Sequence, residues 1–308
     1  MADHKWISGL TADTPLADAA RRALGVRLET VRDNISPAID HADEDIEHVH
    51  QLRVATRRAT AALDIFAVCL PEKTVKHARK SLRRLRRAAG AARDWDVFLL
   101  LLEQEKKRRT TRYRPGIDFL TGYALGHRAA AQESLAEAGH DHPFALDRLL
   151  SETLSDIRRP NDHHAPRSLG ELARELLQGL VDDLERSGAG NVHDYQDLHR
   201  VRIVGKRLRY AIEVVADCFV ARLRDRVYPV VEDLQEILGN ANDSHLAQTR
   251  LSAVCARLQA KMPADWRRLR PGVEGFLHWH EARAAHEREN YLAWRRRWKR
   301  MVGSSKFT

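Results

Sequence analysis

The sequence has 308 residues and a net charge of +9, with 43% hydrophobic and 31% charged residues. It contains no run of about 18 to 20 apolar residues, which excludes a conventional transmembrane helix, and the composition is typical of a globular protein with about two folding units. The excess of positive charge favours polyanionic partners. Cys69, Cys218 and Cys255 are not closely spaced, so neither a disulfide framework nor a zinc site is expected. The N-terminus lacks an apolar signal segment, so we expect a cytoplasmic protein.

Helical periodicity runs through nearly the whole chain, and strand signals are almost absent. Thr14 and Pro15 are a typical helix start, Pro71 ends a helix, Gly90 is a candidate C-cap and Asp94 a candidate N-cap. These signals predict helices over residues 15–36, 45–70, 72–89, 94–109 and 115–139. For residues 140–167 we predict a short helix followed by a connecting loop. Helices are predicted again from there to about residue 299. The predicted fold class is all-α.

The chain matches itself when it is shifted by 149 residues. The shift pairs His50 with His199, Arg53 with Arg202, Arg58 with Arg207, Gly90 with Gly239, and Asp94 with Asp243. One offset that holds over about fifty residues favours an internal duplication. We therefore divide the chain into a first helical half (residues 10–140), a connecting segment (141–166) and a second helical half (167–300).

The two best-matched segments predict amphipathic helices with a cationic column. A helix advances about 100° per residue, so His50, Arg53 and Arg57 share one face, and apolar residues occupy the opposite face. The second copy repeats the column with His199, Arg202, Lys206 and Arg209. A solvated basic face is the simpler interpretation, but such faces usually mix charge signs. Cations that recur every turn suit a chain of repeating anions.

The next helix extends the basic surface in the first half only. Its cations share one arc, and they are Lys73, Lys76, Lys80, Arg83, Arg84 and Arg87. Five of the six matching positions in the second half are aspartate, glutamate or proline, so the two halves are unequal. We expect the first half to bind anions more tightly. This requires that neutralising Lys76, Lys80 and Arg83 costs more affinity than neutralising Arg202 and Lys206.

With these motifs, the chain resembles the CHAD family (conserved histidine α-helical domain). The resemblance rests on the two histidine-led helices and on the segments GAARDWDV, from Gly90, and GNANDSHLA, from Gly239. It implies two helical bundles related by a pseudo-two-fold axis and a basic surface that binds inorganic polyphosphate. It assigns the anion contacts to His50, Arg53, Arg57, Arg58, His199, Arg202, Lys206, Arg207 and Arg209. Some relatives carry a CYTH-type triphosphatase domain, for which we find no counterpart here.

These features predict a polyphosphate-binding protein that is not an enzyme, needs no cofactor or metal, and could attach to polyphosphate granules. Two alternatives remain: a nucleic-acid-binding protein, because a basic helical face binds any phosphate backbone, and a metal-dependent polyphosphate hydrolase. Arginine suits phosphate through its bidentate fork, and histidine adds a charge that an anion stabilises. We expect binding to strengthen as the pH falls from about 8 to about 6. Structural, buried imidazoles are the alternative for His50 and His199.

Overall fold

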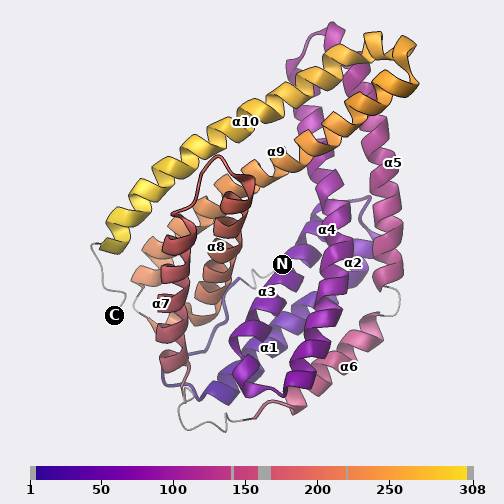
Figure 1. Ribbon diagram of the computed structural model, residues 1–308. Helices are drawn as coiled ribbons and strands as arrows, with labels where there is room; N and C mark the ends of the chain where they lie inside the picture. The colour runs from indigo at the N-terminus through magenta and orange to yellow at the C-terminus, as the bar shows by residue number, and fades with distance from the viewer. Residues whose placement is uncertain (1–4, 140–141, 159–167, 220, 304–308) are drawn as a thin grey trace.

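The computed structural model describes residues 5–139, 142–158, 168–219 and 221–303 of the chain. It is an all-α protein, as the sequence predicts (Figure 1). The helices are α1 (Leu16–Asp33), α2 (Ile35–Asp40), α3 (Glu47–Ile65), α4 (Glu72–Arg108), α5 (Arg114–Gly139), α6 (His142–Ser155), α7 (Leu169–Ser187), α8 (Tyr195–Val215), α9 (Tyr228–Lys261) and α10 (Pro263–Gly303). No described helix is long and apolar enough to cross a membrane.

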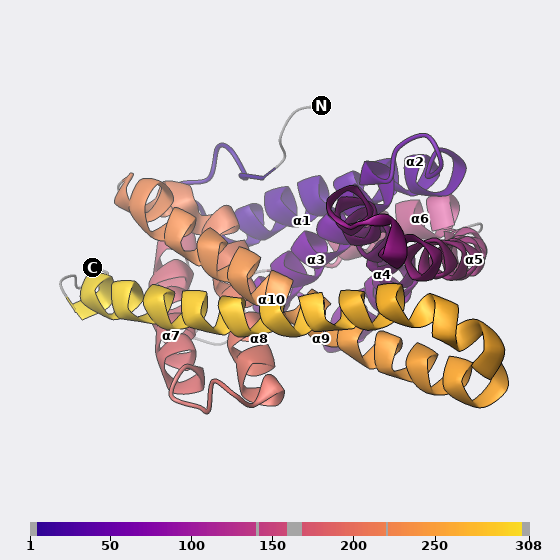
Figure 2. The same ribbon diagram turned by 90° about the horizontal axis from the view of Figure 1, so that it is seen from above.

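Two apolar cores lie at different levels of the molecule. The larger core joins α1, α3, α7 and α8 to the adjoining parts of the four long helices α4, α5, α9 and α10. The smaller core contains Phe98, Leu120, Leu251 and Phe276, and lies where the far ends of those four helices meet. These ends form an arm that projects from the body, at the top of Figure 1. Seen from above, α10 runs along α9 for much of its length (Figure 2).

The prediction that Gly90 ends a helix and Asp94 starts the next is wrong. Both residues lie inside α4, a single helix of 37 residues, and Gly239 and Asp243 likewise lie inside α9. An interior glycine costs a helix about 1 kcal/mol relative to alanine. Buried residues such as Leu85 continue on either side of Gly90 and fill both cores, and this burial outweighs that cost.

The connection between α1 and α2 also differs from the prediction. The first helix ends at Asp33, three residues early, and Asn34 separates it from the short α2. The helix begins at Leu16 with Pro15 at the N-cap position, so Thr14 does not cap it. The predicted short helix between the halves corresponds to α6, which packs against α1 and α4. Residues 159–167 of the predicted connecting loop lie outside the described residues.

Glycines allow the backbones of the arm to touch. A Cβ atom on Gly116 of α5 would lie 2.2 Å from the carbonyl oxygen of Leu269, and one on Gly272 of α10 would lie 2.3 Å from that of Tyr113. No side chain fits at either position. This contact fixes α5 against α10 and thereby holds the ends of the two halves together.

The order of helices is similar in the two halves, as the 149-residue offset predicts. The series α1, α3, α4, α5 corresponds in order to α7, α8, α9, α10 (Figure 1). Asp45 and Asp194, a matched pair, each accept a hydrogen bond from the backbone N–H two residues later, at 2.8 and 2.7 Å. The duplication itself stays a prediction.

Candidate functional site

A cleft with a volume of about 700 Å³ lies between α3 and α8, with α4 and α7 completing its walls. Its lining includes seven arginines and lysines and one histidine, against two aspartates. The basic residues are Arg53, Arg57, Arg86, Arg87, His199, Arg202, Lys206 and Arg207. The cleft therefore joins the cationic columns of both halves into one concave surface.

Four of these basic side chains lie close enough to act on one another electrostatically, namely Arg53 and Arg57 of α3 and Arg202 and Lys206 of α8. Burial, followed by the positive charge of Arg53, lowers the pKa of Arg57 to about 10. Burial, followed by repulsion from Arg57 and Arg202, lowers the pKa of Lys206 to about 5. Burial also lowers the pKa of Arg202. Burial and mutual repulsion therefore disfavour the charged forms of these groups, and a bound anion would stabilise those forms.

The two aspartates of the cleft already have arginine partners. Arg53 donates a hydrogen bond of 3.0 Å to Asp94, and Arg250 of α9 approaches the same carboxylate at 4.0 Å. Arg79 of α4 donates to Asp64 at 2.6 Å. Within the described residues, neither Arg57 nor Lys206 has a carboxylate within 4 Å. Arg202 likewise has no carboxylate within 4 Å among the described residues, so Arg53 is the one member of this group of four that is paired with a carboxylate.

Arg58 and Arg209, two of the predicted anion contacts, do not line the cleft. Both bind the carboxylate of Glu213, which is only 1% exposed. The Arg58 Nε atom donates to it at 2.7 Å, and the Arg209 Nε atom lies 3.4 Å from it. Tyr228 donates a hydrogen bond of 2.8 Å to the same carboxylate, and the Arg27 guanidinium lies 3.9 Å away. We call Glu213 and these four partners the Glu213 cluster; it joins α1, α3, α8 and α9.

The two histidines that head the columns differ in position. His199 lines the cleft, and burial, followed by Arg202 and Lys206, lowers the pKa of its imidazole. His50 is half-buried and does not line the cleft. Its pKa is lowered by burial and by Arg93. Only one of the two predicted histidine contacts is therefore in reach of an anion in the cleft.

The basic stripe on α4 lies mainly outside the cleft. All six of its cations are exposed, and only Arg87 lines the cleft. Lys76 forms an ion pair of 2.6 Å with Glu72 one turn earlier. Arg86, which the stripe analysis did not include, lines the cleft and is half-buried, and burial lowers its pKa. The periodicity of α4 alone gave no signal for Arg86, because α3 and α8 decide which edge of α4 borders the cleft.

Among the described residues, no three histidine, cysteine, aspartate or glutamate side chains are grouped so that they could hold a metal ion. The chemistry that the cleft can supply is multiple charge-assisted hydrogen bonding, in which the guanidinium forks can each hold two anionic oxygens. The cations come from helices on two sides, so a ligand can be contacted along its length. The arrangement suits an anion that is extended and thin enough to enter between α3 and α8.

Comparisons with known proteins agree on one family. A family model described as the CHAD domain matches residues 22–252. The crystal structure of the CHAD domain from the plant Ricinus communis superposes with a TM-score of 0.66 at 26% sequence identity, over 88% of this chain and 95% of that chain. PptA from Streptomyces chartreusis superposes with a TM-score of 0.70 at 16% identity, over 92% of this chain and 100% of that one, which shows a shared fold. No curated protein matches the sequence.

Proposed function

Because the chain belongs to the CHAD domain family, we propose that it binds inorganic polyphosphate in the cleft between α3 and α8, without hydrolysing it. The observation that carries the proposal is the convergence of Arg53, Arg57, Arg202 and Lys206 from two separate helices on one cleft. Three of these residues, Arg57, Arg202 and Lys206, lack a carboxylate partner within 4 Å among the described residues, and only Arg53 has one. A polyanion would supply the missing negative charge at several points at once.

The shape of the cleft favours a thin linear anion over a nucleic-acid duplex. Arg57, Arg202 and Lys206 are partly buried between helices, where a wide, rigid duplex could not reach them. Single-stranded nucleic acid is usually held by several aromatic rings that stack on successive bases. The phenol of Tyr210 is the one Phe, Tyr or Trp ring in the described lining of this cleft. A chain of phosphates needs no such rings.

A binding role also agrees with the state of the two aspartates in the cleft. Metal-assisted phosphoryl hydrolysis uses carboxylates that hold divalent cations. Asp94 and Asp64 instead accept hydrogen bonds from Arg53 and Arg79. Their role in this arrangement is to orient arginines.

The proposal can be tested with an Arg57→Ala/Lys206→Ala double variant. Labelled long-chain polyphosphate would be displaced by unlabelled polyphosphate or by DNA over a range of salt concentrations. We expect the double variant to lose roughly 100-fold in affinity or more, because hydrogen bonds to charged groups contribute about 1.5–3 kcal/mol each. We also expect polyphosphate to outcompete DNA, per phosphate, at physiological salt.

The matched control is Arg257→Ala/Arg268→Ala, which removes the same net charge from exposed positions on the arm. It should change the affinity less than about threefold, because exposed charges are strongly screened. If both double variants weaken binding equally, net charge and not the cleft attracts the ligand. If DNA competes equally with polyphosphate, the protein is a general phosphate-backbone binder and the proposal fails.

A further inference from the structure

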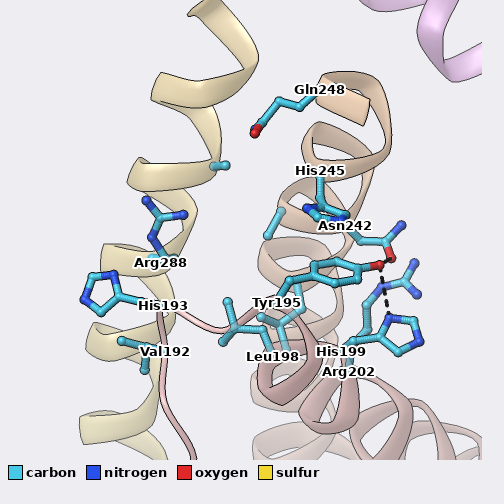
Figure 3. Close-up of a pocket in the computed structure, with 13 residues that line it drawn as sticks. Val192, His193, Tyr195, Leu198, His199, Arg202, Asn242, His245, Gln248 and Arg288 are labelled. Carbon is cyan, nitrogen blue, oxygen red and sulfur yellow. Dashed lines mark hydrogen bonds between the residues drawn. The ribbon is translucent and has the colours of Figure 1, made fainter. Parts of the chain in front are cut away.

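A second, smaller cavity adjoins the cleft. It has a volume of about 240 Å³ and lies between the start of α8, the middle of α9 and α10 (Figure 3). His199 and Arg202 line both the cleft and this cavity, so the two spaces share a wall of cations. A ligand with phosphates in the cleft could therefore extend another group into the cavity.

One wall of the cavity is aromatic and is held in place by stacking and hydrogen bonding. The ring of Tyr195 stacks on the imidazole of His245, with centroids 3.6 Å apart and planes inclined by 12°. The Tyr195 hydroxyl donates a hydrogen bond of 3.1 Å to the Asn242 side chain. Figure 3 shows Tyr195 directed toward His199 and Arg202. The pattern of the cationic column does not predict this ring, because Tyr195 lies at the start of α8, ahead of that column.

The rest of the cavity combines apolar side chains with a few polar and basic ones. Leu198, Leu238, Ala241, Ala284 and Val192 contribute to its lining, and no aspartate or glutamate does so among the described residues. One carboxamide, Gln248, is oriented by the hydrogen bond of 3.1 Å that it donates to the carbonyl oxygen of His280. On the far side, Arg288 of α10 faces the cavity near His193 (Figure 3). Flat apolar surfaces with a few fixed polar groups suit a heteroaromatic ring.

We propose that this cavity holds the base of a nucleoside polyphosphate whose phosphates lie in the cleft, along Arg202 and Lys206. The inference rests on the proposed function, because it requires that the cleft binds phosphates. The cavity is smaller than the roughly 300–1,000 Å³ that drug-sized ligands occupy, so it admits one ring system and not a run of bases. The ligand class is therefore a mononucleotide with several phosphates, and a nucleic-acid strand does not fit.

The distribution of basic side chains over the two spaces matches that of the phosphates in the ligand. Seven arginines and lysines line the cleft, and two, Arg202 and Arg288, are in the described lining of the cavity. Arg57 and Lys206 lie in the cleft, whereas Leu238 and Ala284 lie on the cavity side. Further phosphates in the cavity would lose their hydration against apolar side chains, which is unfavourable. A base gains from the same surfaces and from contact with the Tyr195–His245 pair.

The test compares ATP with inorganic tripolyphosphate, which has the same number of phosphates and no base. Calorimetry would give both affinities for the wild-type protein, for Ala241→Phe and for Tyr195→Leu. Ala241 is partly exposed, so a phenylalanine there can fill the cavity without entering a core. Tyr195→Phe is the matched control, because it keeps the ring and removes only the hydroxyl.

Wild type should bind ATP at least about tenfold more tightly than tripolyphosphate, since base stacking on aromatic side chains has effects of that size. Charge alone would favour tripolyphosphate. Ala241→Phe and Tyr195→Leu should each remove this preference and leave tripolyphosphate binding unchanged, and Tyr195→Phe should retain most of it.

Equal affinities for the two ligands in wild type would overturn the inference and leave the proposed function standing. Equal losses of both ligands in Ala241→Phe and Tyr195→Leu would mean that the cavity holds phosphate, and would also overturn it. If neither ATP nor any inorganic polyphosphate binds, the proposed function itself fails.

Discussion

Arg57 and Arg58 are neighbours in the sequence, but they belong to opposite kinds of cluster. Arg57 faces the cleft, where it meets Arg53, Arg202 and Lys206, and burial among these cations lowers its pKa to about 10. Arg58 faces the other way and donates a hydrogen bond of 2.7 Å to the buried Glu213. In the cleft, four basic side chains lie close together. In the Glu213 cluster, one carboxylate binds three arginines and a tyrosine.

The two clusters therefore differ in role. The cations of the Glu213 cluster stabilise the fold, whereas those of the cleft are available to bind a ligand. In the Glu213 cluster, three arginines from α1, α3 and α8 share one buried carboxylate, so removing that carboxylate leaves them without their common counter-charge. In the cleft, Arg57 and Lys206 repel each other and are not compensated by a neighbouring carboxylate. Neutralising a member of the cleft should therefore cost binding but not stability, and the reverse should hold for the Glu213 cluster.

The largest change in the free energy of unfolding is expected for Glu213→Gln. Removal of a buried ion-pair partner costs about 3–5 kcal/mol, because Arg58, Arg209 and Arg27 lose their common counter-charge. Urea unfolding measures the change. Asp64→Asn is the control, since its exposed pair with Arg79 should contribute only about 0–1 kcal/mol. Polyphosphate affinity per folded molecule should stay within about twofold of wild type, and a large loss would place the Glu213 cluster in the binding site.

Lys206→Met is expected to raise the free energy of unfolding, whereas Glu213→Gln lowers it. The folded-state pKa of Lys206 is about 5, well below its unfolded value, so the unfolded chain holds the proton more tightly. The stability of wild type should therefore rise with pH between about 5 and about 10, by up to about 1.4 kcal/mol per pH unit. Methionine removes this dependence and should stabilise the empty protein near pH 7, because the buried ammonium group and its repulsion by Arg57 and Arg202 are gone. Thermal unfolding at several pH values checks both points, and a parallel pH dependence in the two proteins would contradict them.

The same residue should make polyphosphate binding depend on pH. Lys206 faces Arg53 and Arg57 of α3, Arg202 of α8 and Asp243 of α9. A bound polyanion adds negative charge and raises the pKa of both Lys206 and His199, so binding takes up protons. Affinity should then rise as the pH falls from about 8 to about 6, by at most about tenfold per pH unit for each proton taken up. Titration calorimetry in buffers of different ionisation enthalpy counts the protons, and Lys206→Met should reduce that number.

The smallest change in polyphosphate affinity is expected when the exposed basic stripe on α4 is neutralised. Lys76, Lys80 and Arg83 are exposed and do not line the cleft, so salt screens them. Their joint neutralisation should lower polyphosphate affinity about three- to tenfold at low salt and less at physiological salt. This ranking reverses the one that the sequence predicts, in which the stripe exceeds Arg202 and Lys206. A direct comparison of the triple variant with Arg202→Ala/Lys206→Ala decides between the two rankings.

The sequence alone predicts the all-α fold, because helical periodicity and composition are local properties of the chain. It also identifies the two helices that wall the cleft, since the pattern from His50 recurs from His199. The family follows from these motifs, and the comparisons confirm it. Seven residues with a predicted anion role line the cleft together: Arg53, Arg57, Arg87, His199, Arg202, Lys206 and Arg207.

Only the tertiary structure decides which cations remain available to a ligand. Periodicity places Arg57 and Arg209 on similar faces of their helices, but it does not show that Glu213 and Tyr228 lie next to Arg209. Arg58 meets Glu213 across 155 positions of sequence, and no local pattern predicts that contact. In the sequence, Gly90 likewise resembles a helix end. Only the packing of α4 residues into both cores shows that the helix continues through it. Charge compensation and burial depend on packing between distant helices, whereas helix formation depends on neighbours in the chain.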